Sequence, residues 1–171
     1  MIAFLRKLKG DGAQLPPKPT NKAIGLAWLG GVLAIAAVAA LTDFLSVALV
    51  LGSFGASCVL VFGYPDVPFS QPRNVVAGHV ISSLVGLAFL AVFGPHWWAV
   101  ALAVGTAIAL MMLTRTVHPP AGSNPVIVFL TQPAWEFLLF PTLVGALVLL
   151  YSEAVQHRLF KSYFGSISRF P

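Results

Sequence analysis

The sequence predicts an all-α protein that crosses a membrane several times. Of its 171 residues, 58% are hydrophobic and 9% are charged, and the mean hydropathy is +0.89. A soluble globular domain contains about a quarter charged residues, so this composition excludes a water-soluble fold. A transmembrane β-barrel would show short strands of alternating polarity. The chain instead contains uncharged runs close to the roughly 20 residues that a helix needs to cross the bilayer.

Five apolar runs account for the predicted membrane helices. None of them contains Lys, Arg, Asp or Glu, and the four tryptophans lie near the starts of runs, where an indole suits the headgroup boundary. The runs cover residues 23–41, 44–64, 75–93, 97–113 and 137–151, and a shorter apolar stretch, 126–130, precedes the last one. We expect four long spans, while 44–64 and the region 118–130 form two segments that are broken or re-entrant.

The distribution of charge divides the chain into three parts. We predict a basic N-terminal arm over residues 1–22, a transmembrane domain over 23–153 and a C-terminal tail over 154–171. The basic residues of the two outer parts are Arg6, Lys7, Lys9, Lys18, Lys22, Arg158, Lys161 and Arg169. The positive-inside rule places both termini in the cytoplasm, so the number of crossings is even. We expect the membrane to be a bacterial inner (plasma) membrane.

The net charge of +5 and the pI near 9.8 do not indicate nucleic-acid binding. The basic residues are spread along tails that form no reading surface, so the anionic headgroups of the lipid bilayer are the expected partner. The single cysteine, Cys58, lies inside an apolar run, where a packed thiol is the expected state. The sequence therefore predicts no disulfide, no metal site and no cofactor.

The two halves of the chain present similar motifs in the same order. Each half has a segment of small residues, a short apolar run, a Gln-Pro turn and a span that contains Leu-Val-Gly. These motifs cover residues 53–57, 70–72 and 84–86 in the first half, and 120–124, 131–133 and 143–145 in the second. We interpret them as two tandem copies of one unit, a common transporter plan. Four crossings with parallel copies and six crossings with inverted copies both stay open.

The densest polar cluster is Thr-Arg-Thr-Val-His-Pro-Pro-Ala-Gly-Ser-Asn-Pro, over residues 114–125. Two adjacent prolines cannot lie inside a regular helix, because they remove amide donors and clash with the preceding turn. In hydrocarbon, an irregular backbone persists only where it is buried in protein or lines a wet cavity. We therefore predict a helix break that opens a protected aqueous pocket.

The break has the features of an anion site. Residues 120–123 can begin a short helix, whose free N–H groups and positive dipole end favour an anion. Arg115 would add a planar charged fork that fits the oxygens of nitrite or nitrate. Snorkelling, or pairing with Asp43, Asp66 or Glu136, is the alternative for this arginine. The candidate substrate-binding residues of the break are Arg115, His118, Pro119, Pro120, Gly122, Ser123 and Asn124.

His118 is the strongest single candidate, because an ionisable group at a protected break in the membrane is a functional residue by default. Its imidazole titrates near neutrality and can take up a proton alongside an anion. The alternative is that it braces the break through a hydrogen bond.

The first half of the chain supplies a second candidate set. Ser53 and Ser57 are four residues apart and share one helical face, which either packs or lines a path. Gln71 caps a turn, whereas Arg73 can concentrate anions in a vestibule. The candidate residues of this set are Ser53, Gly55, Ser57, Gln71, Arg73, Asn74 and His79.

Three ordered motifs resemble the HPP family of small integral membrane proteins. They are Gly52-Ser53-Phe54-Gly55-Ala56-Ser57, then Gln71-Pro72-Arg73-Asn74-Val75 with Gly78-His79, and then Leu-Thr-Arg-Thr-Val-His-Pro-Pro-Ala-Gly over residues 113–122. The family takes its name from the His-Pro-Pro carried here by His118, Pro119 and Pro120. The similarity covers residues 23–151 and implies a transporter-like protein. Plant chloroplast and cyanobacterial members are associated with nitrite transport.

These observations predict a transporter or channel for a small inorganic anion, above all nitrite, with proton coupling as an option. A homo-oligomer is expected, because so short a chain encloses a broad cavity poorly and its small-residue spans can pack together. No enzymatic activity is expected. One alternative is an intramembrane enzyme that acts on a lipid or quinone through His118, although no paired carboxylate or metal set accompanies it. The other is a scaffold without a path, whose breaks would be dry and packed.

Overall fold

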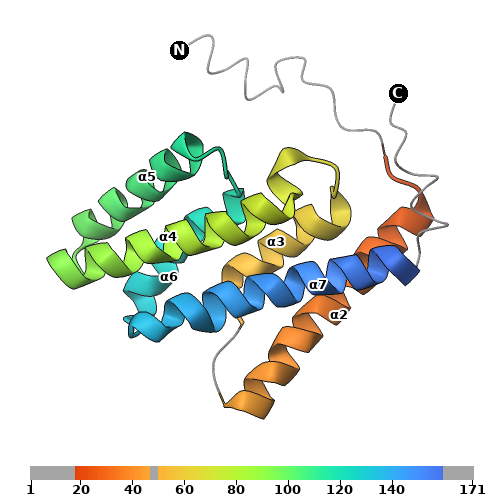
Figure 1. Ribbon diagram of the computed structural model, residues 1–171, viewed down its shortest axis with the longest axis horizontal. Coiled ribbons are helices and arrows are strands. Elements are labelled where there is room, and N and C mark those ends of the chain that lie inside the picture. The colour runs from red at the N-terminus through yellow and green to blue at the C-terminus, as the bar shows by residue number, and fades with distance from the viewer. Residues whose placement is uncertain (1–17, 47–49, 160–171) are drawn as a thin grey trace, which may run out of the picture.

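The computed structural model describes residues 18–46 and 50–159, which form helices and no strand (Figure 1). The α-helices are α2 (Asn21–Leu45), α3 (Gly52–Gly63), α4 (Pro72–Phe93), α5 (Trp97–Leu113), α6 (Asn124–Thr131) and α7 (Val144–Leu159). Between them lie the 3₁₀ turns η1 (Pro68–Ser70), η2 (Pro119–Ser123) and η3 (Trp135–Leu138), and a π-helical turn, η4 (Leu139–Leu143). The predicted all-α class is confirmed for this part of the chain, while most of the predicted arm and tail lies outside it.

Within the described residues, three helical segments are long and apolar enough to cross a membrane: Asn21–Leu45, Pro72–Phe93 and the stretch Trp135–Arg158. Two shorter apolar helices accompany them, α5 with 17 residues and α3 with 12. This pattern fits a membrane protein built from helices. The four long spans and the two tandem copies stay predictions.

The observed helix ends match some of the apolar runs but not the second and the last. In the last run, 137–151, α7 begins only at Val144 and continues to Leu159. The predicted run 97–113 coincides with α5. In the run 44–64, by contrast, α2 continues to Leu45 and α3 begins only at Gly52. Ser46, with a φ of 53°, adopts the left-handed conformation in which many helices end. The second run is therefore divided between two helices, and α3 is too short to cross the bilayer alone.

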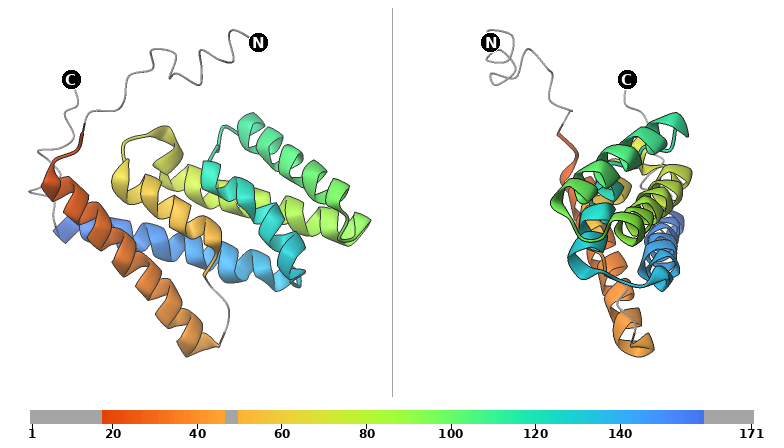
Figure 2. Two further views of the ribbon diagram at one scale, coloured as in Figure 1. Left: turned by 180° about the vertical axis from the view of Figure 1, so that it is seen from behind. Right: turned by 90° about the vertical axis from the view of Figure 1, so that its left-hand side faces the viewer.

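The two shortest α-helices, α3 and α6, pack against the longer ones: α3 contacts α2 and α7, and α6 contacts α4 and α5 (Figures 1 and 2). α2 packs against α7, and α4 packs against α5, in both cases with opposite directions. The start of α2 and the end of α7 lie at the same end of the molecule, where the Gln156 side-chain amide donates to the Leu26 carbonyl at 2.6 Å. α3 and α6 run in opposite directions, and α3 contacts the turn η2 that leads into α6.

Small residues allow α5 to lie close to α4. The buried residues of α5 are four apart and form one stripe along the helix: Ala99, Ala103, Ala107 and Met111. The three alanines belong to an apolar cluster with Val85 of α4. Many large apolar side chains instead face outward, such as Trp97, which is 83% exposed. This outward apolar surface is the one that lipid would cover.

α4 and α6 approach each other closely at Gly86. A Cβ atom on this glycine would lie 2.9 Å from the Cα of Pro125 and 3.2 Å from the Cβ of Val128. The first contact is with backbone, which cannot rotate away, so a residue without a side chain is required. α4 thereby fixes the position of α6 and of the break that precedes it.

Replacing Gly86 by alanine should destabilise the protein by about 1–3 kcal/mol, the usual cost of overpacking a core. Gly105 in α5 is the matched control, because a Cβ there would meet nothing within 4 Å. Gly105→Ala should be neutral or stabilise by up to about 1 kcal/mol through its higher helix propensity. Thermal unfolding in detergent micelles measures both effects. Equal melting temperatures for the two variants would contradict the close contact between α4 and α6.

Candidate functional site

α5 ends before the two prolines are reached, at Leu113. The Thr116 N–H donates to the carbonyl of Met111 at 2.9 Å. The Arg115 N–H donates to that of Met112 at 3.1 Å, which completes the Schellman pattern of helix ends. Arg115 holds the left-handed position of this motif, with a φ of 57°. Glycine is the usual residue there, since an L side chain strains the backbone, so this arginine occupies a strained position.

After this turn the backbone is irregular, and side chains of α4 satisfy its carbonyl groups. Arg73 Nη2 donates to Arg115 O at 3.3 Å, Asn74 Nδ2 to Val117 O at 3.0 Å, and Ser82 Oγ to Ala121 O at 2.6 Å. Unpaired backbone groups in hydrocarbon cost several kcal/mol each. α4 therefore provides the partners that water would provide in a soluble protein.

A regular series of residues on α4 faces the break. Its members, each four residues after the last, are Asn74, Gly78, Ser82 and Gly86. This spacing places them on one helical face. At Gly78, a Cβ atom would lie 2.7 Å from the Cβ of His118 and 3.3 Å from the Thr116 carbonyl oxygen. Each turn of α4 thus gives the break either a hydrogen-bond donor or room for a close approach.

Four side chains meet beside the break in a buried, hydrogen-bonded array. Ser57 Oγ lies 2.9 Å from Nε2 of His79 and 2.8 Å from Nε2 of His118. Asn124 Nδ2 lies 3.1 Å from Nδ1 of His79. All four residues are 0% exposed, although they come from α3, α4, the break and α6. We call Ser57, His79, His118 and Asn124 the central array.

The partners in the central array determine which nitrogen carries each proton. The Phe69 carbonyl, 2.7 Å from Nδ1 of His118, can only accept, so this Nδ1 is protonated. Nε2 of a neutral His118 then accepts from the Ser57 hydroxyl. His79 donates from Nε2 to Ser57 Oγ and accepts at Nδ1 from the Asn124 amide. With both histidines neutral, each of these bonds has one donor and one acceptor.

The central array continues into residues that sequence reasoning missed. Asn124 Nδ2 donates to Ser83 Oγ at 2.9 Å, and Ser83 Oγ lies 2.9 Å from Oγ1 of Thr142. Ser83 follows His79 by four residues, so this polar spacing inside an apolar run was the available signal. Thr142 gives no such signal, because it lies in η4, where the helix is kinked at Phe140.

Two buried polar atoms beside the central array have no hydrogen-bond partner among the described residues, Ser53 Oγ and Asn124 Oδ1. Ser53 is 3% exposed and lies in the first turn of α3, and its carbonyl is 3.1 Å from Ser57 Oγ. Leaving such an atom unpaired costs about 1–3 kcal/mol. A hydroxyl and an amide oxygen are thus available to a further partner at the starts of α3 and α6.

The break itself is packed, which corrects the expectation of an aqueous pocket at the double proline. His118, Pro120 and Ala121 are all buried, and Gly78 allows α4 to lie directly against the break. The expectation assumed that water would satisfy the irregular backbone. The side chains of α4 do so instead, and the space is filled by protein.

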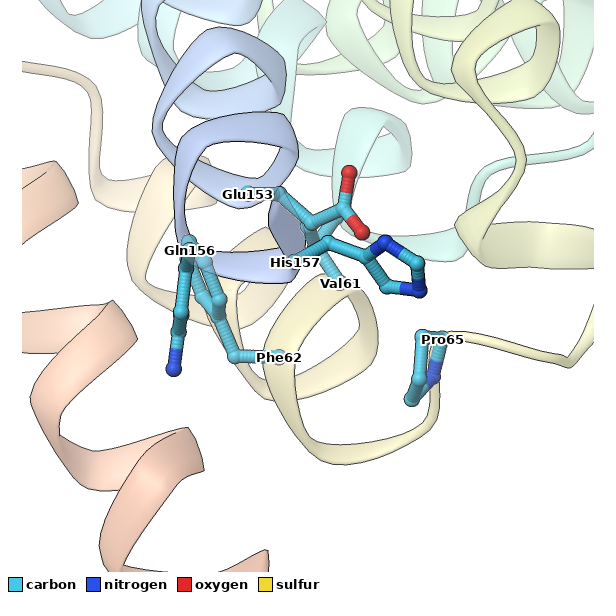
Figure 3. Close-up of a pocket in the computed structure, with 6 residues that line it drawn as sticks. All are labelled: Val61, Phe62, Pro65, Glu153, Gln156 and His157. Carbon is cyan, nitrogen blue, oxygen red and sulfur yellow. The ribbon is translucent and has the colours of Figure 1, made fainter. Parts of the chain in front are cut away.

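Two cavities in the described part of the chain lie away from the central array. One, of about 20 Å³, lies where the end of α3 meets the end of α7, and Figure 3 shows its lining: Val61, Phe62, Pro65, Glu153, Gln156 and His157. The other, of about 360 Å³, extends from Leu51, just before α3, to η3 and η4, and includes Thr131 and Glu136. No member of the central array lines either cavity.

The structure divides the predicted site residues into three groups. Ser57, His79, His118 and Asn124 form the central array, with Ser53 beside it. Arg73 and Asn74 brace the break, and Pro120 is buried within it. Gly55, Gln71, Arg115, Pro119 and Ser123 are exposed, and Gly122 is partly exposed. The part that each residue plays in binding stays a prediction.

Known proteins resemble this chain over almost its whole length. The sequence model of the HPP transmembrane region matches residues 16–164. Two curated relatives from Dictyostelium discoideum, each named only as a transmembrane protein, are 35% identical over 170 residues and 34% identical over 166 residues. These alignments cover 91% and 90% of this chain but 59% and 53% of the relatives, so the chain spans little more than half of their length. No solved structure matches the chain.

Replacing Asn124 by alanine should lower the free energy of unfolding by about 1–3 kcal/mol, because His79 and Ser83 lose a buried partner. The adjacent Ser123 is exposed and its hydroxyl donates to the Pro120 carbonyl of its own turn. Ser123→Ala is therefore the matched control, with an expected loss below about 0.5 kcal/mol. Unfolding in detergent micelles provides the comparison.

A double variant tests whether the array acts as one network. His79→Ala and Asn124→Ala remove the same hydrogen bond, so together they should cost less than the sum of the single variants. Strict additivity of the two losses would show that the side chains do not interact.

Proposed function

Because this chain belongs to the HPP transmembrane family, we propose that it is a membrane transporter or channel for a small inorganic anion, with nitrite as the expected substrate. One observation carries the proposal: two short helices of opposite direction meet at the buried central array, α3 through Ser57 in its second turn and α6 through its first residue, Asn124. Discontinuous helices that begin inside the membrane are a recurrent means of holding anionic groups, since their N-terminal ends carry positive partial charge.

The donors around the central array suit a small anion. The first turn of α3 carries backbone N–H groups without partners in their own helix. At the start of α6, the Asn124 N–H donates to the Ala121 carbonyl and Pro125 has no N–H, so side chains supply the donors there. Ser57, His79 and Asn124 add hydroxyl, imidazole and amide donors, which bond to neighbouring residues in this structure and would exchange those partners for the anion. The Ser53 hydroxyl has no partner among the described residues and is free to donate. Nitrite offers oxygens that accept such bonds, and in a water-poor site these bonds are stronger than in water. The site therefore favours an anion of a few atoms.

The packing of the helices supports an inverted duplication with six passes. The first unit would be α2, α3 and α4, and the second α5, α6 and α7. α2 packs against α3 and α7, and α5 packs correspondingly against α6 and α4. The contact of α4 with α6 likewise corresponds to the contact of α7 with α3. A two-fold axis in the membrane plane would produce these matching contacts, and inverted repeats of this kind enclose midplane sites in transporters.

Two arginines lie at the protein surface beside the break. Arg73 begins α4 and Arg115 follows α5, and the hydrogen bond from Arg73 to the Arg115 carbonyl brings the two residues together. Both are exposed. Two neighbouring cations raise the local concentration of anions and accelerate their arrival. We assign these arginines to a vestibule that leads to the central array.

The proposal includes a homo-oligomer in a bacterial inner membrane with both termini in the cytoplasm. The start of α2 and the end of α7 lie at one end of the molecule, as an even number of passes requires. The exposed apolar side chains along the long helices leave surface for contact between copies as well as with lipid.

The complete burial of the central array favours one alternative, a membrane scaffold without a path. A transporter in a closed conformation and a scaffold would share this packing. Measurement of flux separates them, because a scaffold moves no anion.

The contact between Ser57 and His118 favours another alternative, an intramembrane enzyme that acts on a lipid or quinone. A hydroxyl 2.8 Å from an imidazole whose other nitrogen is held by a carbonyl has the geometry of a nucleophile beside its base. Covalent labelling of Ser57 by a fluorophosphonate, absent in Ser57→Ala, would support this function in place of transport.

Proteoliposomes that contain the purified chain should take up labelled nitrite, whereas vesicles without protein should not. The assay is run at mildly alkaline pH, because nitrous acid, which crosses lipid unaided, is then almost absent. Arg115→Asn keeps a residue that tolerates the left-handed backbone but removes the charge. We expect initial uptake at low nitrite to fall about threefold to tenfold through loss of electrostatic attraction. His118→Ala should abolish uptake.

Arg158→Asn is the control for net charge, since Arg158 is an exposed arginine near the end of α7. Its uptake should match that of the unchanged chain. Equal losses in Arg115→Asn and Arg158→Asn would remove Arg115 from the vestibule. Uptake no greater than that of empty vesicles would reject anion transport and leave the scaffold.

A further inference from the structure

We propose that the central array binds one proton together with the transported anion, with His118 as the proton acceptor and the Ser57 hydroxyl as the group that switches between two hydrogen-bond arrangements. This inference rests on the proposed anion transport and names its coupling ion. The geometry around Ser57 carries it.

The hydroxyl of Ser57 has three partners and a single hydrogen. Nε2 of His79 lies 2.9 Å from Oγ, Nε2 of His118 lies 2.8 Å away, and the Ser53 carbonyl oxygen lies 3.1 Å away. The carbonyl can only accept, whereas each imidazole nitrogen either donates or accepts. In the neutral array the hydrogen points to His118, and the Ser53 carbonyl is available to it as a second acceptor.

An added proton leaves all of these bonds intact. The proton binds the lone pair of Nε2 of His118, and the resulting N–H donates to Ser57 Oγ, while Nδ1 continues to donate to the Phe69 carbonyl. The Ser57 hydrogen rotates onto the Ser53 carbonyl. Ser57 Oγ then accepts from both histidines, and no heavy atom needs to move. Loss of the proton from Nε2 reverses the rotation.

His79 is a poorer acceptor for the same proton. Its Nε2 already donates to Ser57, so a proton would have to bind Nδ1. That nitrogen accepts from the Asn124 amide at 3.1 Å, and protonation would place two N–H groups face to face. The orientation of Asn124 therefore directs the proton to His118.

The protonated array lacks a counter-charge within the described part of the protein. The polar groups around His118 are Ser53 and Ser57 from α3, Asn74 and His79 from α4, the Phe69 carbonyl from η1, and Asn124 from α6. None of them is a carboxylate. Arg73 and Arg115 are exposed cations, and Asp66 lies exposed in the loop after α3. A buried cation without a partner is costly, so an anion that enters the array removes this cost.

Proton and anion therefore bind better together than apart. By thermodynamic reciprocity, the proton raises the affinity for the anion by the same factor as the anion raises the affinity for the proton. The free Ser53 hydroxyl, which has no partner among the described residues, offers the anion a donor next to the protonated pair. The transported pair carries no net charge.

Isothermal titration of the purified full chain with sodium nitrite near neutral pH tests the inference directly. The heat of binding, measured in buffers of different ionisation enthalpy, gives the number of protons taken up with each nitrite. We expect about one proton per bound nitrite, a value below one being set by the fraction of His118 already protonated. Sodium gluconate is the control salt, because its anion is too large for the array.

Two variants distinguish the role of His118 as proton acceptor from the role of Ser57 as the hydroxyl that changes its hydrogen-bond partner. His118→Gln keeps hydrogen-bonding groups at the position but binds no proton, so nitrite binding should weaken about tenfold or more and proton uptake should be lost. Ser57→Ala removes the hydroxyl that accepts from the imidazolium, and proton uptake should fall several-fold. Ser152→Ala is the matched control, since the Ser152 hydroxyl donates to the Val148 carbonyl of its own helix. It should behave as the unchanged chain does, and thermal unfolding verifies that each variant is folded.

The outcomes distinguish this inference from the proposed function. Nitrite binding or flux without proton uptake would overturn the inference and leave anion transport in place. Proton uptake on nitrite binding without flux in proteoliposomes would support the inference and overturn transport. Proton uptake that survives in His118→Gln would assign the proton to another group and overturn the role of His118. Absence of both binding and flux from the folded chain would overturn both proposals.

Discussion

The need to pair the backbone of the break without water determines much of the interior. α5 ends at Leu113, before the two prolines at residues 119–120, and three carbonyl groups of the segment that follows accept from Arg73, Asn74 and Ser82 of α4. These donors reach the break only because Gly78 and Gly86 let α4 approach it closely. The same close approach places His79 and His118 beside each other, with ring centroids 5.0 Å apart. The polar centre of the protein thus results from the way in which α4 pairs the irregular backbone of the break.

Ser57 connects the two halves of the chain at this centre. Ser57 comes from α3, whereas His118 comes from the break before α6. The Ser57 hydroxyl bonds to His79 of the first half and to His118 of the second. A hydroxyl is suited to this position because it donates one bond and accepts others at the same time. A carboxylate could only accept when ionised, and an ammonium could only donate. The serine therefore hydrogen-bonds to two imidazoles without placing a permanent charge between them.

The sequence was sufficient to find the break and every residue of the central array, but not their packing. The double proline predicted the interruption, and Ser57, His79, His118 and Asn124 were all candidates before the structure. Ser57 and His118 are 61 residues apart in the chain, and no local pattern says which helical faces meet. For the same reason, the sequence predicted that water would pair the backbone of the break, whereas side chains of α4 pair it. Thr142, which lies in a kinked turn, was not a candidate either. Arg115 was expected inside the site, yet the end of α5 holds it at the surface.

An anion can reach the central array only if packing on one side of it separates, and the contacts suggest where that costs least. α4 holds the break by three side-chain bonds to backbone and by the close approaches at its glycines. α3 is held to the break through the single hydroxyl of Ser57 and through the Phe69 carbonyl just beyond its end. Separation of α4 from the break would leave backbone groups unpaired in hydrocarbon, which is costly. Separation of α3 leaves one such carbonyl, that of Phe69, and frees the Ser57 hydroxyl and the His118 imidazole, which an entering anion can itself bind. The asymmetry follows from chemistry alone, because backbone carbonyls cannot be satisfied by an anion, whereas hydroxyl and imidazole donors can.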